Sequence, residues 1–175
     1  NPGSAALGYS AVTKQAQFSS IAILHRLGLR WRAVIFDNGP PYARNCLSLN
    51  GGGNVAKRFA KEGYHTVLCR RSDEDGLNKM VAEIEANGGS ASGYLLNAVE
   101  PDGLEERIAD VEANIGPIDA VVFNLGAQIG DRSLSNTSYK AFEIGWRMAT
   151  FALFRMASAV TPLMEERGRG TILVT

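Results

Sequence analysis

The sequence is poor in the residues that build metal sites and disulfides. It holds two histidines, His25 and His65, and two cysteines, Cys46 and Cys69, at no metal-ligand spacing. Lysine plus arginine and aspartate plus glutamate both number 18, so no basic surface for nucleic acid or an anionic membrane is predicted. No apolar run reaches the ~20 residues that a membrane-spanning helix needs. We therefore expect a reduced, cytoplasmic protein without a metal, a nucleic-acid partner or a membrane partner.

The ends of the chain and its first fifty residues show the weakest patterns. The chain begins at Asn1 and ends at Thr175 within the β-like run GTILVT, so we expect a fragment of a longer protein. Residues 1–50 form a turn-rich leader, in which Arg32–Asp37 (RAVIFD) has the composition of a short buried strand. Two interpretations stay open: an unrelated leader whose RAVIFD run acts as the first strand, which we favour, or a rearranged segment. Residues 51–175 are predicted to form one incomplete domain.

Three consecutive glycines begin the stretch whose secondary structure the sequence predicts most clearly. Because glycine loses the most backbone entropy in a helix interior, Gly51, Gly52 and Gly53 predict a tight turn that precedes a helix. Residues 54–63 have apolar side chains at helical spacing and end in glycine, and residues 65–69 are short and apolar, as in a buried strand. Bare N–H groups at a helix N-terminus favour an anion. We predict a phosphate site here, with a plain loop as the alternative.

Helices and strands then alternate to the end of the chain. The predicted helices cover residues 73–88, 101–116 and 139–167, and the predicted strands cover 90–96, 118–124 and 171–175. This alternation predicts the α/β class, with a doubly wound parallel sheet of the Rossmann type that is truncated in this chain. In such sheets the ligand lies at the carboxyl ends of the strands.

Three motifs resemble those of the short-chain dehydrogenase/reductase family, and the resemblance covers Gly51–Thr175. IDAVVFNLGA resembles the family's strand ending in N-N-A-G, with Asn124 and Gly126 at the second Asn and the Gly. LLNAVEPDGLEE resembles the segment with a D-V pair beside the adenine, and Asn97 and Ala98 stand in its place. TPLMEERGRGTILVT resembles the helix end and the strand that lead to the catalytic serine. The resemblance implies a Rossmann fold that binds NAD(P).

The resemblance also implies an activity and an assembly. Members of the family are oxidoreductases that move hydride between a nicotinamide cofactor and a small carbonyl or alcohol substrate. Their long helix commonly packs against its copy, so a homodimer or homotetramer is expected for the intact protein. The residues support such an interface, because helix 139–167 carries large apolar side chains around much of its circumference. We therefore expect this helix to bury more than one side.

The glycine turn and the long helix depart from the family's pattern. Gly52 falls on the last glycine of the family's T-G-x-x-x-G-x-G turn, while Cys46 and Asn50 occupy the other two glycine positions. A side chain at either position would crowd a backbone that approaches the pyrophosphate closely. Ala149 stands where many members carry a catalytic asparagine.

The catalytic residues of the family have no certain counterpart in this chain. The serine and the Tyr-x-x-x-Lys pair would follow Thr175. The segment NPGSAALGYSAVTKQA resembles that region, but Tyr9 and Lys14 are five residues apart, which is about 140° around a helix, so they would not share a face. We leave the catalytic residues unassigned and expect this chain alone to be inactive. The alternative is a non-catalytic Rossmann module that binds a nucleotide or a partner.

Two arginines at the end of the strand 65–69 indicate the cofactor. An acid at this position binds the ribose 2′-hydroxyl of NAD, whereas Arg70 would accept the 2′-phosphate of NADP, with Arg71 as a weaker second contact. We therefore predict NADP, with NAD as the other possibility, and two solvated loop arginines as the alternative. The predicted cofactor-binding residues, which should converge at one edge of the sheet, are Gly51, Gly52, Gly53, Arg70, Arg71, Asn97, Asn124 and Gly126.

Overall fold

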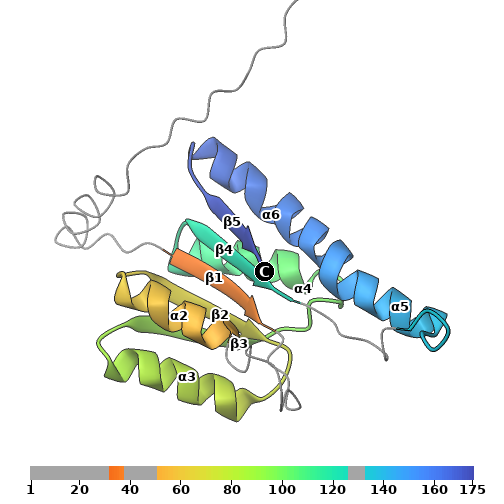
Figure 1. The fold of residues 1–175 in the computed structure, drawn as a ribbon. Coiled ribbons are helices and arrows are strands. Elements are labelled where there is room, and N and C mark those ends of the chain that lie inside the picture. The colour runs from red at the N-terminus through yellow and green to blue at the C-terminus, as the bar shows by residue number, and fades with distance from the viewer. Residues whose placement is uncertain (1–31, 38–50, 126–132) are drawn as a thin grey trace, which may run out of the picture. The chain divides into compact units, whose positions relative to one another are not determined.

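The computed structural model describes residues 32–37, 51–125 and 133–175 (Figure 1). All the described residues belong to one compact unit within Trp31–Thr175. The strands are β1 (Arg32–Asp37), β2 (His65–Arg70), β3 (Ser90–Leu95), β4 (Ala120–Asn124) and β5 (Thr171–Val174). The helices are α2 (Gly51–Lys61), α3 (Glu74–Ala86), α4 (Gly103–Asp110), α5 (Tyr139–Trp146) and α6 (Ala152–Glu166), with π-helical turns η1 (Val111–Ile115) and η2 (Arg147–Phe151).

The five strands form one parallel sheet in the order β3-β2-β1-β4-β5 (Figure 1). Each pair is parallel, and β1 lies at the centre between β2 and β4. The run RAVIFD is therefore the central strand, with the bounds that the sequence indicated. Since the chain moves outward from β1 first through β2 and β3 and then through β4 and β5, the order reverses between β1 and β4. Ligands of such sheets bind at this switch point.

Helices cover both faces of the sheet, as the doubly wound prediction requires. Alternate residues of a strand point to opposite faces, so each strand feeds two separate cores. One core joins α2 and α3 to the sheet through Ala33, Ile35, Ala56, Ala60, Leu68, Leu77, Ile84, Ala91, Ala120 and Val122. The other joins α4, η1 and α6 to the opposite face through Val34, Phe36, Val67, Cys69, Leu104, Ile108, Val111, Val121, Phe123, Ala152, Met156, Val160 and Met164.

The glycine cluster is part of a helix and not a turn before it. Helix α2 begins at Gly51, so Gly51, Gly52 and Gly53 form its first turn. The sequence-based boundary was wrong because the entropy cost of glycine counts against helix interiors, while the N–H groups of a first turn have no intrahelical partner in any case. A Cβ at Gly53 would lie 2.5 Å from Met80 Cε of α3, so the flexible end of Met80 would have to shift to admit a side chain there.

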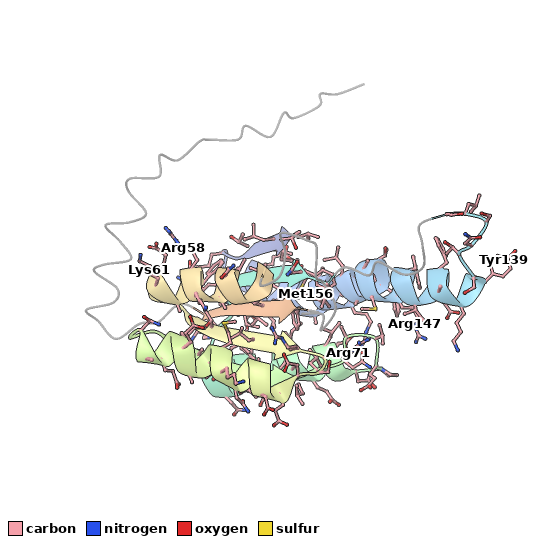
Figure 2. All side chains as sticks on the ribbon, turned by 60° about the horizontal axis from the view of Figure 1, so that its bottom comes forward. Arg58, Lys61, Arg71, Tyr139, Arg147 and Met156 are labelled. Atoms are coloured by element: carbon pink, nitrogen blue, oxygen red, sulfur yellow. The ribbon has the colours of Figure 1, made fainter. Side chains whose placement is uncertain are left out.

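Within a single copy of the chain the long C-terminal helix buries one stripe, and the expected burial of more than one side stays a prediction that concerns a second copy. Its segments α5, η2 and α6 follow one another without a break, and α6 buries Ala152, Met156, Val160 and Met164. The α5 segment buries no residue, and Figures 1 and 2 show it extending beyond the sheet. Phe142 is 69% exposed and Phe154 is 65% exposed. No element within the described residues covers these rings. None of the helices described here is long and apolar enough to cross a membrane.

Candidate functional site

The register of the sheet brings two predicted site residues to the same edge. The last residue of β1, Asp37, is paired with Arg70 of β2 on one side and with Asn124 of β4 on the other. Arg70 is in turn paired with Leu95, the last residue of β3. The carboxyl ends of four strands therefore form one row across the switch point. The predicted site requires Asn124 and the start of α2 to lie at the same edge of the sheet. The structure does not place them at opposite edges.

The start of α2 lies at the same edge as this row. Helix α2 ends at Lys61, and the chain turns through Glu62–Tyr64 into β2, so the C-terminus of α2 lies at the amino edge of the sheet. The N-terminus of α2, with Gly51–Gly53, therefore lies at the carboxyl edge. The N–H groups of this first turn have no partner within the helix and sit at the positive end of its dipole. They can bind an anion at the switch point.

Arg70 is held by an aspartate that the sequence analysis placed in the next helix. Its Nη1 donates to Asp73 Oδ2 at 2.8 Å, and the Arg70 side chain is only 12% exposed. Asp73 is the N-cap of α3, with a left-handed backbone (φ 68°), and its Oδ1 accepts a hydrogen bond from Gly76 N at 3.0 Å. One carboxylate thus caps α3 and orients Arg70. The i,i+3 spacing of Arg70 and Asp73 is the signal in the sequence that could have indicated this pair.

Arg71 is the more accessible of the two arginines. It is exposed, follows directly after the end of β2, and makes no hydrogen bond or ion pair with any residue that the structure describes. Figure 2 labels its side chain near the end of β2. Arg71 therefore offers its guanidinium to solvent, whereas Arg70 has a carboxylate partner.

Asn97 closes a turn directly after β3. Its Nδ2 donates to Glu100 Oε1 at 2.9 Å, and its Oδ1 accepts from Val99 N at 3.4 Å. The backbone N–H of Glu100 also donates to the carbonyl of Asn97 at 3.1 Å. The turn stays beside the site, because Leu96 N donates to the carbonyl of Arg70 at 2.8 Å. The bonds that Asn97 makes are thus to residues of its own turn.

Asn124 links β4 to the end of the chain. Its Oδ1 accepts a hydrogen bond from Thr175 Oγ1 at 2.6 Å, and Thr175 N donates to the carbonyl of Phe123 at 3.2 Å. This bond fixes the Asn124 side chain at the switch point. The remaining predicted residue, Gly126, lies outside the described residues.

A shallow pocket of about 240 Å³ opens between the β3–α4 loop and the long helix. Its lining residues are Val99, Pro101, Asp102, Arg147, Phe151 and Arg155. This volume is below the roughly 300–1,000 Å³ of ligand sites, so the pocket alone cannot hold a dinucleotide. The sequence analysis did not single out Arg155. The signal for it was a charged residue within an apolar stretch, between Phe154 and Met156, and Met156 is fully buried in the structure. In the described part of the chain, no group of His, Cys, Asp and Glu is placed to hold a metal ion.

The comparisons with known proteins agree with this fold. The family model described as short chain dehydrogenase matches residues 51–175. A rabbit (Oryctolagus cuniculus) protein, dehydrogenase/reductase SDR family member 4, is 26% identical over 120 residues, which are 69% of this chain and 46% of that protein. The chain thus spans about half the length of the curated relatives it matches.

Two solved structures are similar and differ in the cofactor they contain. A metagenomic short-chain oxidoreductase in complex with NADP has a TM-score of 0.73 and 22% identity, over 82% of this chain and 61% of that one. An NAD⁺-bound xylitol dehydrogenase has a TM-score of 0.71 and 20% identity, over 82% of this chain and 52% of that one. These two likenesses concern the fold, while the family model covers well over half of the sequence. With its parallel sheet and its matched residues 51–175, the chain belongs to the short chain dehydrogenase family.

Proposed function

We propose that this chain is the nucleotide-binding part of an oxidoreductase that transfers hydride between NADP(H) and a small carbonyl or alcohol substrate. The observation that carries the proposal is the row at the carboxyl edge of the sheet. Arg70 and Asn124 flank the last residue of β1, next to the start of α2 and at the point where the strand order reverses. Dinucleotides bind at this position in open α/β sheets.

The groups at this edge fit an anionic nucleotide. The first-turn N–H groups of α2 would hold the pyrophosphate, because they lack intrahelical partners and lie at the positive end of the helix. The exposed guanidinium of Arg71 would hold a ribose 2′-phosphate, with Arg70 kept in place beside it by Asp73. Asn124 would border the nicotinamide half, on the β4 side of the switch point. When bound, the nicotinamide supplies the hydride chemistry.

We expect the protein to bind NADP(H) more tightly than NAD(H), chiefly through Arg71. A charge-assisted hydrogen bond contributes about 1.5–3 kcal/mol, which corresponds to roughly ten- to a hundredfold in affinity. Arg71→Ala should therefore weaken NADP binding by about this factor and leave NAD binding nearly unchanged. Arg70→Ala should have a smaller effect, because the Arg70 charge is already paired with Asp73.

Calorimetric titration of both cofactors against the wild type and the two variants measures this preference. Arg58→Ala is the matched control, since Arg58 is an exposed arginine on α2 that pairs with Glu62 at 2.7 Å. Equal affinities of the wild type for NADP and NAD would show that both arginines are ordinary surface residues. A larger loss in Arg70→Ala than in Arg71→Ala would return the main role to Arg70.

A second candidate function is a non-catalytic Rossmann module that binds a nucleotide. One observation favours it: Ala149 stands in the place of the asparagine that many family members carry. The coding sequence beyond Thr175 separates this candidate from the first, because a serine followed by a Tyr-x-x-x-Lys pair there would support the oxidoreductase.

We also propose that the exposed face of the long helix joins two copies of the protein. Trp146 and Phe151 stack on each other with centroids 5.4 Å apart, and Phe142 and Phe154 are largely exposed. A cluster of aromatic rings in contact with water is typical of an interaction site. A homodimer or homotetramer would cover it.

The double variant Phe142→Lys, Phe154→Lys is expected to be monomeric at micromolar concentration, whereas the unaltered protein should be at least dimeric. Each lysine places a charge in the interface, where it would lose water without gaining a partner. Light scattering coupled to size-exclusion chromatography measures the mass. A double variant with lysines at two exposed sites of α3, Asn78→Lys and Ala82→Lys, controls for added charge. Monomers in the unaltered protein would contradict the proposed assembly.

A further inference from the structure

Arg155 of α6 reaches across to the loop between β3 and α4. Its Nε donates to Glu105 Oε1 at 2.7 Å, and its Nη2 donates to Glu105 Oε2. Its Nη1 donates to the backbone carbonyl of Glu100 at 2.8 Å and to that of Ala98 at 3.4 Å. One guanidinium therefore binds the start of α4 and two carbonyls of the loop. These two carbonyls belong to residues that precede Arg155 by 55 and 57 positions in the sequence.

The surroundings of Arg155 make these bonds strong. The Arg155 side chain is only 12% exposed, and the two-point contact with Glu105 matches the planar fork of the guanidinium. The hydrogen bond from Arg155 holds the pKa of the Glu105 carboxyl below its ordinary value, against a smaller opposing effect of burial. Glu105 is therefore ionised at neutral pH and the pair is complete.

The loop that Arg155 binds is also anchored in the core, where Ala98 is buried and Leu96 packs against it. Asn97 closes its turn locally, through Val99 and Glu100. Leu96 N joins the loop to the carbonyl of Arg70, at the end of β2. The bonds from Arg155 hold the carbonyl groups of Ala98 and Glu100 in this loop, which lies beside the end of β2 at Arg70.

We propose that Arg155 is a positioning residue for nucleotide binding, which holds the loop Asn97–Glu100 in place as a wall beside the base of the nucleotide. This inference rests on the proposed function, because it takes the carboxyl edge of the sheet to be the dinucleotide site. Arg155 itself does not touch the ligand. It acts through the carbonyls of Ala98 and Glu100, and Glu105 keeps its guanidinium in the required plane.

The test compares Arg155→Met with Arg167→Met. Arg167 is a matched control, because it also makes a two-point contact with a glutamate (Glu112, both bonds 3.0 Å) and donates to a backbone carbonyl, that of Ile118 at 3.0 Å. Its partners lie at the opposite, amino edge of the sheet, next to the start of β4. Both variants lose a half-buried ion pair, and only one of them affects the loop.

Two measurements are made on each variant. Amide hydrogen exchange at Val99 and Glu100, without nucleotide, reports how firmly the loop is held. Titration with adenosine 2′,5′-bisphosphate, which carries the base and the 2′-phosphate, reports the affinity of this half of the site. Arg155→Met should speed exchange at these two amides and weaken binding about tenfold. Arg155→Lys, which keeps the charge but not the fork, should lie between Arg155→Met and the wild type.

The outcomes separate this inference from the proposed function. Equal effects of Arg155→Met and Arg167→Met on binding would show a general loss of stability and would overturn the positioning role. Unchanged exchange at Val99 and Glu100 in Arg155→Met would overturn it as well. Failure of the wild type to bind the bisphosphate or NADP would overturn the proposed function and the nucleotide-binding role of Arg155, while the exchange data would still show whether Arg155 holds the loop.

Discussion

The 175-residue chain is expected to bind NADP(H) without turning it over. None of its tyrosines has a lysine four residues later, so the pair that would lower the tyrosine pKa and take the alcohol proton is missing. General acid–base assistance contributes about 10²–10⁴ in rate. The row at the carboxyl edge of the sheet, which is Asp37, Arg70, Leu95 and Asn124, contains neither a tyrosine nor a lysine.

The measurement is the absorbance of NADPH with the purified chain and a panel of aldehydes and ketones. We expect no oxidation above the rate without protein, although titration should show binding. Steady substrate-dependent oxidation would contradict the prediction. In that event Tyr9→Phe and Lys14→Met become the decisive variants, because loss of the activity in both would assign the catalytic pair to the N-terminal segment. Turnover unaffected by either variant would require a different proton donor.

The thiol of Cys69 is expected to react about a thousandfold more slowly in the folded protein than in the unfolded chain. Cys69 is 2% exposed in the core between the sheet and α4, and burial raises its pKa to about 12, while the nearby Arg107 charge lowers it only in part. The thiolate is the reactive form, so about three units of pKa reduce its population about a thousandfold. Labelling with a chromogenic disulfide in a Cys46→Ser background, with and without denaturant, measures this ratio. Rapid labelling of the folded protein would show that Cys69 is accessible.

The same thiol should make the protein less stable in alkali. In the unfolded chain a cysteine ionises near pH ~8.5, whereas folded Cys69 keeps its proton up to about pH 12. Its contribution to stability is therefore complete below pH ~8.5 and is lost as the pH rises toward the folded pKa, by about 1.4 kcal/mol per unit. Urea denaturation of the Cys46→Ser protein and of its Cys69→Val derivative, over this pH range, isolates the effect. The valine variant should lack this part of the decline.

The order of elements could be predicted from the sequence because it depends on local patterns. Short apolar runs such as RAVIFD and IDAVVFN alternate with helical patterns, and right-handed crossovers then restrict the topology to a doubly wound parallel sheet. The placement of Arg70 and Asn124 at one edge followed from the same rule, since strand ends of a parallel sheet share an edge. The start of α2 at Gly51 was missed because helix propensity is weakest as a guide in the first turn.

The partners of the charged side chains could not be read from the sequence. Whether Arg70 is available to a phosphate depends on Asp73, whose left-handed backbone turns its carboxylate back toward β2 while it caps α3. Arg155 and its partners Glu105, Glu100 and Ala98 are at least 50 residues apart along the chain, and only the packing of α6 against α4 brings them together. Such bonds have no local signature.

The sequence by itself thus determined the fold class, the family and the edge of the sheet where a nucleotide would bind, because periodicity, strand ends and motifs are properties of neighbouring residues. The tertiary structure decided which arginine is accessible, which residue holds the β3–α4 loop, and that the long helix buries only the stripe of Met156 and Val160. These features depend on which surfaces meet when distant elements pack. A helix with apolar side chains on several faces shows its exposed face only once its neighbours, the sheet and α4, are in place.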